Sequence, residues 1–242
     1  MAILTPNELL EQAIELEELG KVDEAKDLYQ QTINASPDWA TPYYNLGLIY
    51  KYELEWDESL KYNKLATVKD PENEAAWWNT GIAATALGDW RTARECWNKV
   101  GLQYEVHDLP LDEDLGNTPV RLNPNEDAEV VWCKRVDPAR AVILNIPLPS
   151  SNHRFGDLVL NDGAPEGYRI SNGKEYPVLN ELQLLTKSDY KTYSVLLFNA
   201  EQSHVDKLES LCEEVEIEME DWTTIRLLCK QCSEGTSSLA QE

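Results

Sequence analysis

Apolar side chains over residues 1–107 follow a helical period, and the whole pattern recurs along the chain with a period of 34. In the second copy, positions i, i+3, i+4 and i+7 of one helix face are Tyr43, Leu46, Gly47 and Tyr50. A second amphipathic stretch follows and ends before Pro71, because proline cannot continue a helix. The pattern predicts two helices in each of three copies, with boundaries at 6–39, 40–73 and 74–107.

Several columns of this repeat hold residues of one size. Gly47 recurs as Gly81, and Pro37 recurs as Pro71. One column of small side chains consists of Ala25, Ser59 and Ala93, and a column of larger ones consists of Tyr29, Asn63 and Trp97. Small side chains let two paired helices approach closely, and large ones fill the space between them. The columns therefore predict closely packed helix pairs.

With this period and these columns, residues 6–107 resemble the tetratricopeptide repeat family. The matching residues in the second copy are Tyr43-x2-Leu46-Gly47-x2-Tyr50, Ser59, Ala66 and Pro71. The third copy matches with Trp77-x2-Thr80-Gly81, Ala93 and Trp97. The resemblance implies an all-α, right-handed helical solenoid that binds protein partners in its concave groove, and it does not imply an enzyme.

The resemblance also places the groove on fixed positions of each first helix. An apolar strip there consists of Tyr44, Leu48, Tyr52, Trp78 and Ile82, with the amides of Asn45 and Asn79 beside it. Tyr and Trp are favoured interface anchors because they bury a large area at low entropy cost. We expect the groove to bind an extended peptide or a helix of a protein partner. The alternative is that the protein's own chain covers these aromatic side chains.

One subgroup of the family grips the C-terminal carboxylate of chaperone tails with Lys, Arg and Asn side chains. Asn45 and Asn79 match its amide positions, but Leu10, Ala75 and Asn79 stand where cations are needed. A carboxylate without a cation loses its charge-assisted hydrogen bond. The sequence therefore disfavours a chaperone-tail ligand.

The second half of the chain has a different pattern. Residues 108–125 hold three prolines and neither period, which predicts a linker. No capping helix follows Gly101, so we expect the second domain to cap the last repeat. Expected strands are Ala128–Val136, Ala141–Pro147, Asp157–Leu160, Tyr168–Ile170, Val178–Leu185, Tyr190–Phe198 and Thr224–Cys229, with a helix at Glu201–Val215. Turns are expected at Asn161-Asp162-Gly163 and Asn172-Gly173. This predicts a smaller α+β domain over 126–232 and a polar tail over 233–242.

Cys229 and Cys232 form a CxxC pair, a spacing used for zinc or redox chemistry. A structural zinc ion takes four ligands, and no second CxxC is present. Two further ligands would have to come from Cys133, Cys212, His153 or His204. The hypothesis that competes with peptide binding is therefore a zinc-binding C-terminal domain, with the repeats as its targeting arm. The remaining alternative is an incidental pair of cysteines.

Catalytic motifs are not found: the sequence has no GxSxG, HExxH, P-loop or glycine-rich nucleotide fingerprint. The segments His153–Asp157 and Asn161–Pro165 could form a binding loop, although turn chemistry explains them equally well. We therefore predict a non-catalytic protein, and an enzyme with its site in residues 150–180 is the remaining alternative.

Charge and cysteine content narrow the partners and the compartment. The 44 acidic and 21 basic side chains give a net charge of −23, which disfavours nucleic acid and anionic membranes as partners. No apolar stretch reaches the length of a membrane-spanning helix, and the acidic N-terminus does not resemble a secretion signal. Five scattered cysteines suit a reducing compartment. We expect a cytoplasmic protein.

Overall fold

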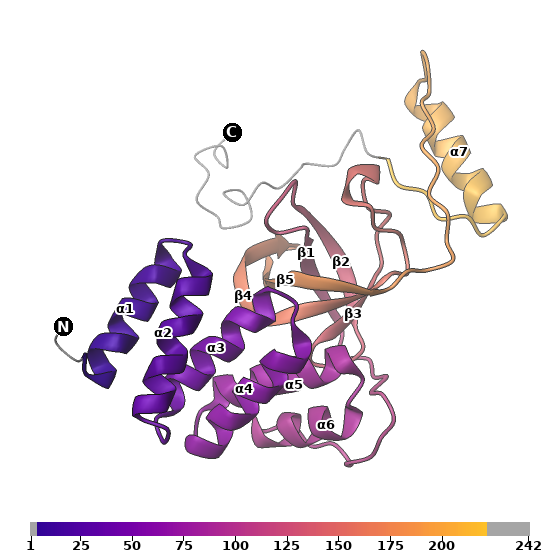
Figure 1. Cartoon of the computed structure of the whole chain (residues 1–242). Helices are drawn as coiled ribbons and strands as arrows, with labels where there is room; N and C mark the ends of the chain where they lie inside the picture. The colour runs from indigo at the N-terminus through magenta and orange to yellow at the C-terminus, as the bar shows by residue number, and fades with distance from the viewer. Residues whose placement is uncertain (1–3, 222–242) are drawn as a thin grey trace. The chain divides into compact units, whose positions relative to one another are not determined.

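The computed structural model describes residues 4–221, and the chain divides into two compact units. The first unit is Met1–Leu111 and the second is Asp112–Glu242. Helices build the first unit and a strand barrel dominates the second (Figure 1). The division lies inside the segment that the sequence analysis assigns to the linker, and each unit is considered by itself.

Three helix hairpins form the first unit, one for each predicted repeat. The helices are α1 (Pro6–Glu18), α2 (Val22–Ala35), α3 (Ala40–Tyr52), α4 (Trp56–Lys69), α5 (Glu74–Leu87) and α6 (Trp90–Lys99). The fold predicted from the repeat period is thus confirmed. The first helix begins with a capping box, in which Thr5 and Glu8 satisfy each other's backbone N–H groups. Pro6 follows at a position where a missing N–H costs nothing.

The turns inside the three hairpins share one backbone conformation. Gly20, Leu54 and Gly88 occupy the same repeat position, and their φ angles are +73°, +61° and +72°. This left-handed region suits glycine and costs about 1–2 kcal/mol for a residue with a Cβ. Leu54 is therefore a strained position, held by the helices on either side of it.

The glycine column of the repeat, Gly47 and Gly81, packs directly against the column of large side chains that contains Asn63 and Trp97. A Cβ on Gly47 would lie 2.6 Å from Asn63 Cγ, and one on Gly81 would lie 2.6 Å from the Trp97 ring. Ser59 donates a hydrogen bond to the Gly47 carbonyl at 2.9 Å, which records how closely α3 and α4 approach. Each glycine therefore provides the space for the large side chain that faces it from the second helix of its hairpin.

Residues 102–111 form an irregular strap that is bound to α6. Arg94 is only 5% exposed, and its guanidinium donates to the carbonyls of Glu105, Leu109 and Pro110 at 3.0–3.2 Å. Asn98 and Tyr104 exchange two further hydrogen bonds of 2.7 and 2.9 Å. The strap satisfies part of the role that a capping helix has in other repeat arrays. It belongs to the first unit, and the capping of the last repeat by the second domain stays a prediction.

Replacing Arg94 by Ala is expected to lower the free energy of unfolding of the helical unit by about 3 kcal/mol. The substitution removes three hydrogen bonds from a charged donor and the packing of a buried side chain. Urea unfolding followed by Trp fluorescence measures this loss, because six of the eight Trp lie in this unit. Arg91→Ala is the control, since its ion pair with Asp108 is largely exposed and little change is expected. Equal losses in the two variants would contradict the role of the strap.

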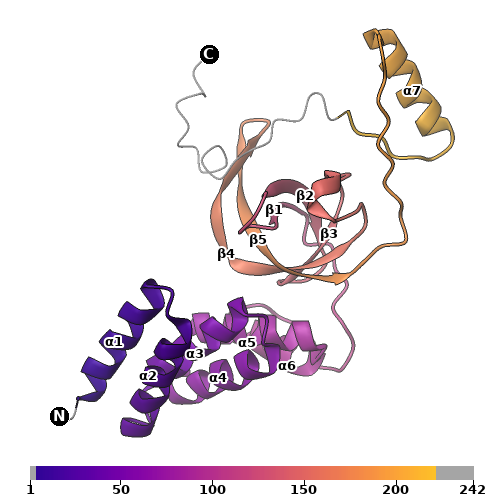
Figure 2. The ribbon, with the colours of Figure 1, turned by 45° about the horizontal axis from the view of Figure 1, so that its top comes forward.

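The second unit contains a closed five-stranded barrel, seen end-on in Figure 2. Its strands are β1 (Asn117–Leu122), β2 (Glu129–Arg135), β3 (Arg140–Ile143), β4 (Leu158–Ser171) and β5 (Lys174–Thr186). Neighbours in sequence pair antiparallel, and the barrel closes through parallel pairing of β1 with β5. The core consists of Val120, Leu122, Val131, Cys133, Ala141, Ile143 and Val159. The helix α7 (Gln202–Glu214) follows the barrel and has no buried residue.

Three details of the second unit differ from the sequence expectations. The strand β1 lies within 108–125, where a linker was predicted, because closure of the barrel gives this short proline-containing segment partners on both sides. Residues Asn161–Gly163 lie inside β4 at a series of register shifts instead of forming a turn, which bends the long β4–β5 hairpin. Residues Tyr190–Phe198 form no strand, and all of them except the half-buried Thr192 are exposed, since no neighbouring strand pairs with them. The predicted Asn172-Gly173 turn is present.

Candidate functional site

The predicted groove residues on α3 retain accessible surface. Tyr44 and Leu48 are half-buried, with Tyr44 packed against the core of the helical unit, while Tyr52 is 59% exposed. The ammonium of Lys51 lies 4.4 Å from the centroid of the Tyr52 ring, which is within cation–π range. Lys51 itself is 2% exposed, so the accessible surface here is mainly apolar.

The two groove asparagines already have hydrogen-bond partners within the protein. Asn45 donates to the Tyr29 hydroxyl at 3.2 Å, and that hydroxyl donates to Glu17 at 2.7 Å. Asn79 is 6% exposed, and its Oδ1 accepts from the Lys51 ammonium at 3.2 Å. The amides therefore connect neighbouring helices. Sequence reasoning missed the chain from Glu17 through Tyr29 to Asn45, whose only signal was a tyrosine in the column of large side chains.

The groove residues on α5 are less accessible than the repeat register predicts. Ile82 has no exposed surface, and Trp78 packs edge-on against Trp97 with ring centroids 5.1 Å apart. The sequence contains a signal for this: after Glu74, α5 carries no charged residue, and a helix that is apolar on all sides is buried. Trp78 is half-buried, like Tyr44 and Leu48, and Tyr52 on α3 is the most exposed residue of the predicted apolar strip.

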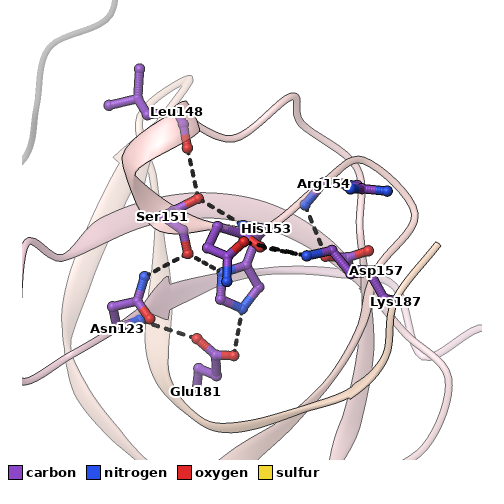
Figure 3. Close-up of polar contacts among 9 residues, drawn as sticks. Asn123, Leu148, Ser151, His153, Arg154, Asp157, Glu181 and Lys187 are labelled. Atoms are coloured by element: carbon purple, nitrogen blue, oxygen red, sulfur yellow. Dashed lines mark hydrogen bonds and ion pairs between the residues drawn. The ribbon is translucent and has the colours of Figure 1, made fainter. Parts of the chain in front are cut away.

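A second constellation of polar side chains lies in the barrel unit, around His153 (Figure 3). His153 is 8% exposed and follows the short 3-10 helix Pro149–Ser151. Its Nδ1 lies 2.7 Å from the Ser151 carbonyl oxygen, and its Nε2 lies 2.6 Å from Glu181 Oε1 on β5. The other Glu181 oxygen accepts from the backbone N–H of Asn123 at 3.1 Å. The pair ties the β3–β4 connection to β5 and to the end of β1.

The hydrogen-bond pattern fixes where the protons lie on this pair. A carbonyl only accepts, so Nδ1 carries a proton, and Nε2 then needs a second proton to bond a carboxylate. Burial opposes a charge on His153, but the hydrogen bond and negative charge of Glu181 outweigh it and raise the pKa of the imidazole above its ordinary value. Asp157 acts in the same direction. The two hydrogen bonds and the raised pKa both favour the protonated form of the His153 ring beside Glu181.

The same turn explains the candidate loop His153–Asp157. Asp157 has no exposed surface, and its carboxylate accepts from the backbone N–H groups of Arg154 at 2.8 Å and Ser188 at 2.7 Å. The aspartate therefore holds the turn and the segment after β5 together.

The proposed zinc ligands Cys229 and Cys232 lie outside the described residues. Of the four side chains that would complete the site, Cys133 is buried in the barrel core, where burial raises the pKa of its thiol, and His153 is bound to Glu181. The other two, Cys212 and His204, lie on α7 and are not part of the barrel. Within 4–221, no three His, Cys, Asp or Glu side chains gather as a metal site.

Helix hairpins that recur at a fixed spacing define a helical repeat protein, and comparison with known proteins identifies the repeat. Residues 9–38 match the family model for the tetratricopeptide repeat, so the helical unit contains a tetratricopeptide repeat segment. Within the described part of the chain, none of the helices has the length and hydropathy needed to cross a membrane.

Similarity to individual proteins extends over part of the chain. The heat-shock protein cognate co-chaperone sgt12 of Aspergillus fumigatus is 32% identical over 83 residues, which are 34% of this chain and 24% of that protein. The first tetratricopeptide repeat domain of Spaghetti (RPAP3), bound to the HSP90 peptide SRMEEVD, is 23% identical with a TM-score of 0.38 and covers 40% of this chain and 76% of its own. The tetratricopeptide repeat domain of Sgt2 from Aspergillus fumigatus is 24% identical with a TM-score of 0.36. The match covers 39% of this chain and 63% of that one. The chain thus spans about a quarter of the curated relative that it matches.

Proposed function

We propose that the protein is a non-catalytic interaction protein whose repeat segment binds a peptide or protein segment. The supporting observation is the surface on α3, where Tyr52 is 59% exposed beside the half-buried Tyr44 and Leu48. Aromatic and aliphatic side chains that are already fixed by helix packing lose little entropy on binding. Ile14 of α1, 37% exposed, adds apolar surface to a first helix of the array. The predicted set is Tyr44, Asn45, Leu48, Tyr52, Trp78, Asn79 and Ile82, and the proposal rests on its apolar members on α3.

The ligand that this surface fits is an apolar segment. The curated relative is called a heat-shock cognate co-chaperone, which raises a chaperone tail as a second ligand class. Leu10 is buried at a position where a tail carboxylate needs a cation, and the Lys51 ammonium is already bonded to Asn79. A terminal carboxylate would therefore lack its charge-assisted partner. The competing zinc hypothesis retains Cys229 and Cys232, and metal content of the purified chain tests it separately.

Peptides selected by display on the full chain are expected to lose about tenfold or more in affinity when Tyr52 and Leu48 are replaced by Ala. Isothermal titration of each selected peptide measures the change. Tyr168→Ala is a matched control, because Tyr168 is 55% exposed on the barrel hairpin and equally large. Unchanged affinity in the α3 variant, or an equal loss in the control, would contradict the proposed surface. A carboxylate-terminated SRMEEVD peptide that binds far more tightly than its amidated form would instead support the chaperone-tail class.

A further inference from the structure

A cavity of about 380 Å³ opens in the barrel unit between two loops. One side is the turn after the 3-10 helix, and the other is the segment that follows β5. Its polar lining consists of Asn152, His153, Arg154, Lys191, Thr192 and Tyr193. No lining residue is acidic, although acidic residues outnumber basic ones about two to one in the chain. The cavity is therefore locally opposite in character to the protein as a whole.

The cations at this cavity are not neutralised by carboxylates. Among the described residues, Arg154, Lys187 and Lys191 have no ion pair, whereas Lys26, Lys69 and Arg91 are ion-paired elsewhere in the chain. Lys187 instead approaches the oxygens of Asn152 at 3.3–3.4 Å. Arg154 and Lys191 line the cavity, and Lys187 lies beside it at Asn152. Cations without a counter-ion at one cavity favour an anion as its ligand.

The two buried carboxylates nearest the cavity, those of Asp157 and Glu181, are directed to other partners. Asp157 accepts from two backbone N–H groups, and Glu181 accepts from the His153 ring and the Asn123 N–H. Both are buried, and neither contributes to the cavity lining. Figure 3 shows the Arg154 side chain extending away from the His153–Glu181 pair. Its guanidinium donates to the Tyr190 carbonyl at 3.2 Å, which leaves other donors of the planar fork for a ligand.

The two walls of the cavity are fixed relative to each other. Ser188 donates from its hydroxyl to the Phe155 carbonyl at 2.6 Å and from its N–H to Asp157 at 2.7 Å. The rings of Phe155 and Tyr190 meet edge-on, with centroids 5.0 Å apart. A Cβ on Gly156 would lie 3.2 Å from the Tyr190 ring, so the approach is close. Such support lowers the entropy cost of binding.

We propose that this cavity binds a small phosphorylated compound. A guanidinium recognises two oxygens of a phosphate in one plane, and Lys191 adds a point charge. The hydroxyls of Thr192 and Tyr193 supply neutral donors from the same wall. The volume lies within the range of small-molecule sites and admits a phosphate with an attached organic group. The site is separate from the peptide surface on α3 and does not depend on it.

Phenyl phosphate and inorganic phosphate are the probes, with benzoate as the carboxylate comparator. Titration of the ¹⁵N-labelled full chain in dilute chloride buffer is expected to give saturable amide shifts at Asn152, Arg154 and Lys191–Tyr193. Phenyl phosphate affinity is expected to fall by about tenfold in Arg154→Gln and in Lys191→Gln. Lys207→Gln, which removes an exposed charge from α7, is expected to leave it unchanged. Arg154→Lys keeps the charge without the fork, and an intermediate affinity is expected.

Several outcomes would overturn the proposal. One is an absence of saturable shifts at about 10 mM phenyl phosphate, because binding weaker than this is weaker than expected of a specific site. Another is a loss of phenyl phosphate affinity in Lys207→Gln equal to that in Arg154→Gln. If benzoate bound as tightly as phenyl phosphate, the cavity would not be specific for phosphate over carboxylate. A phosphoserine peptide that binds much more tightly than either phosphate probe would assign the cavity to a macromolecule instead. Retention of the wild-type amide spectrum outside the cavity shows that each variant is folded.

Discussion

Replacing Gly81 by Ala should destabilise the helical unit by about 2–3 kcal/mol, although alanine is the better helix former by about 1 kcal/mol. The added Cβ would lie 2.6 Å from the Trp97 ring, which has no exposed surface and also packs against Trp78. The ring has no free space to move into, so the helices α5 and α6 must separate. The midpoint of urea unfolding should fall without a change in the slope.

A double-variant cycle distinguishes this clash from a general sensitivity of α5. Phenylalanine at position 97 lacks the outer indole atoms that the new Cβ would meet. Gly81→Ala should therefore cost little in a Trp97→Phe background, and the two substitutions should be strongly non-additive. Additive effects would show that the glycine column does not form the close contact.

The repeat architecture was predictable because its signals are local and periodic. The regular spacing of the repeat identifies the helices, and Gly81 with Trp97 identifies the packing of one pair. The burial of Ile82 was not predicted. The repeat register places Ile82 on the concave face, but α5 is apolar on all sides and is therefore buried on that face too. A family pattern therefore locates the helix faces, and the composition of each helix shows which face remains accessible.

The barrel was less predictable because its pairings connect distant residues. The segment β1 contains Pro119 and is only six residues long, and its parallel pairing with β5 joins residues far apart in the chain, as in Val120 with Leu179. The exposed run Tyr190–Phe198 has a strand-like composition but no partner. Arg154 belonged to the possible binding loop His153–Asp157 that the sequence indicated. Lys191 was missed, because the two residues line one cavity only after the chain has folded.

Replacing Glu181 by Ala should lower the free energy of unfolding of the barrel by about 3–5 kcal/mol, as is usual when one member of a buried ion pair is removed. The substitution leaves the His153 ring buried beside an empty space and removes the acceptor for the Asn123 N–H. Amide hydrogen exchange of β1 and β5 measures the loss independently of the helical unit. Glu175→Gln, an exposed position on the same strand, should have little effect.

The same pair should make the barrel less stable as the pH rises above neutral. The folded pKa of His153 lies above its ordinary value of about 6.5, so the native state holds one more proton than the unfolded chain between these two pKa values. The stabilisation is complete below about pH 6.5 and is lost as the pH rises through the folded pKa, with a slope of up to about 1.4 kcal/mol per pH unit. The carboxylates that act on His153 are Glu181, Asp157 and Glu129.

Glu181→Gln tests this origin without leaving a cavity. Its amide can donate to a neutral His153 Nε2 while its oxygen accepts from the Asn123 N–H, so the contacts survive without the extra proton. The variant should remain folded and lose the pH dependence between pH 6 and 8. This pH window avoids a second effect. Burial raises the folded pKa of the Cys133 thiol, so stability also changes with pH near about 8.5, where cysteine thiols of the unfolded chain titrate. A pH profile in Glu181→Gln equal to that of the wild type would show that another group carries the effect.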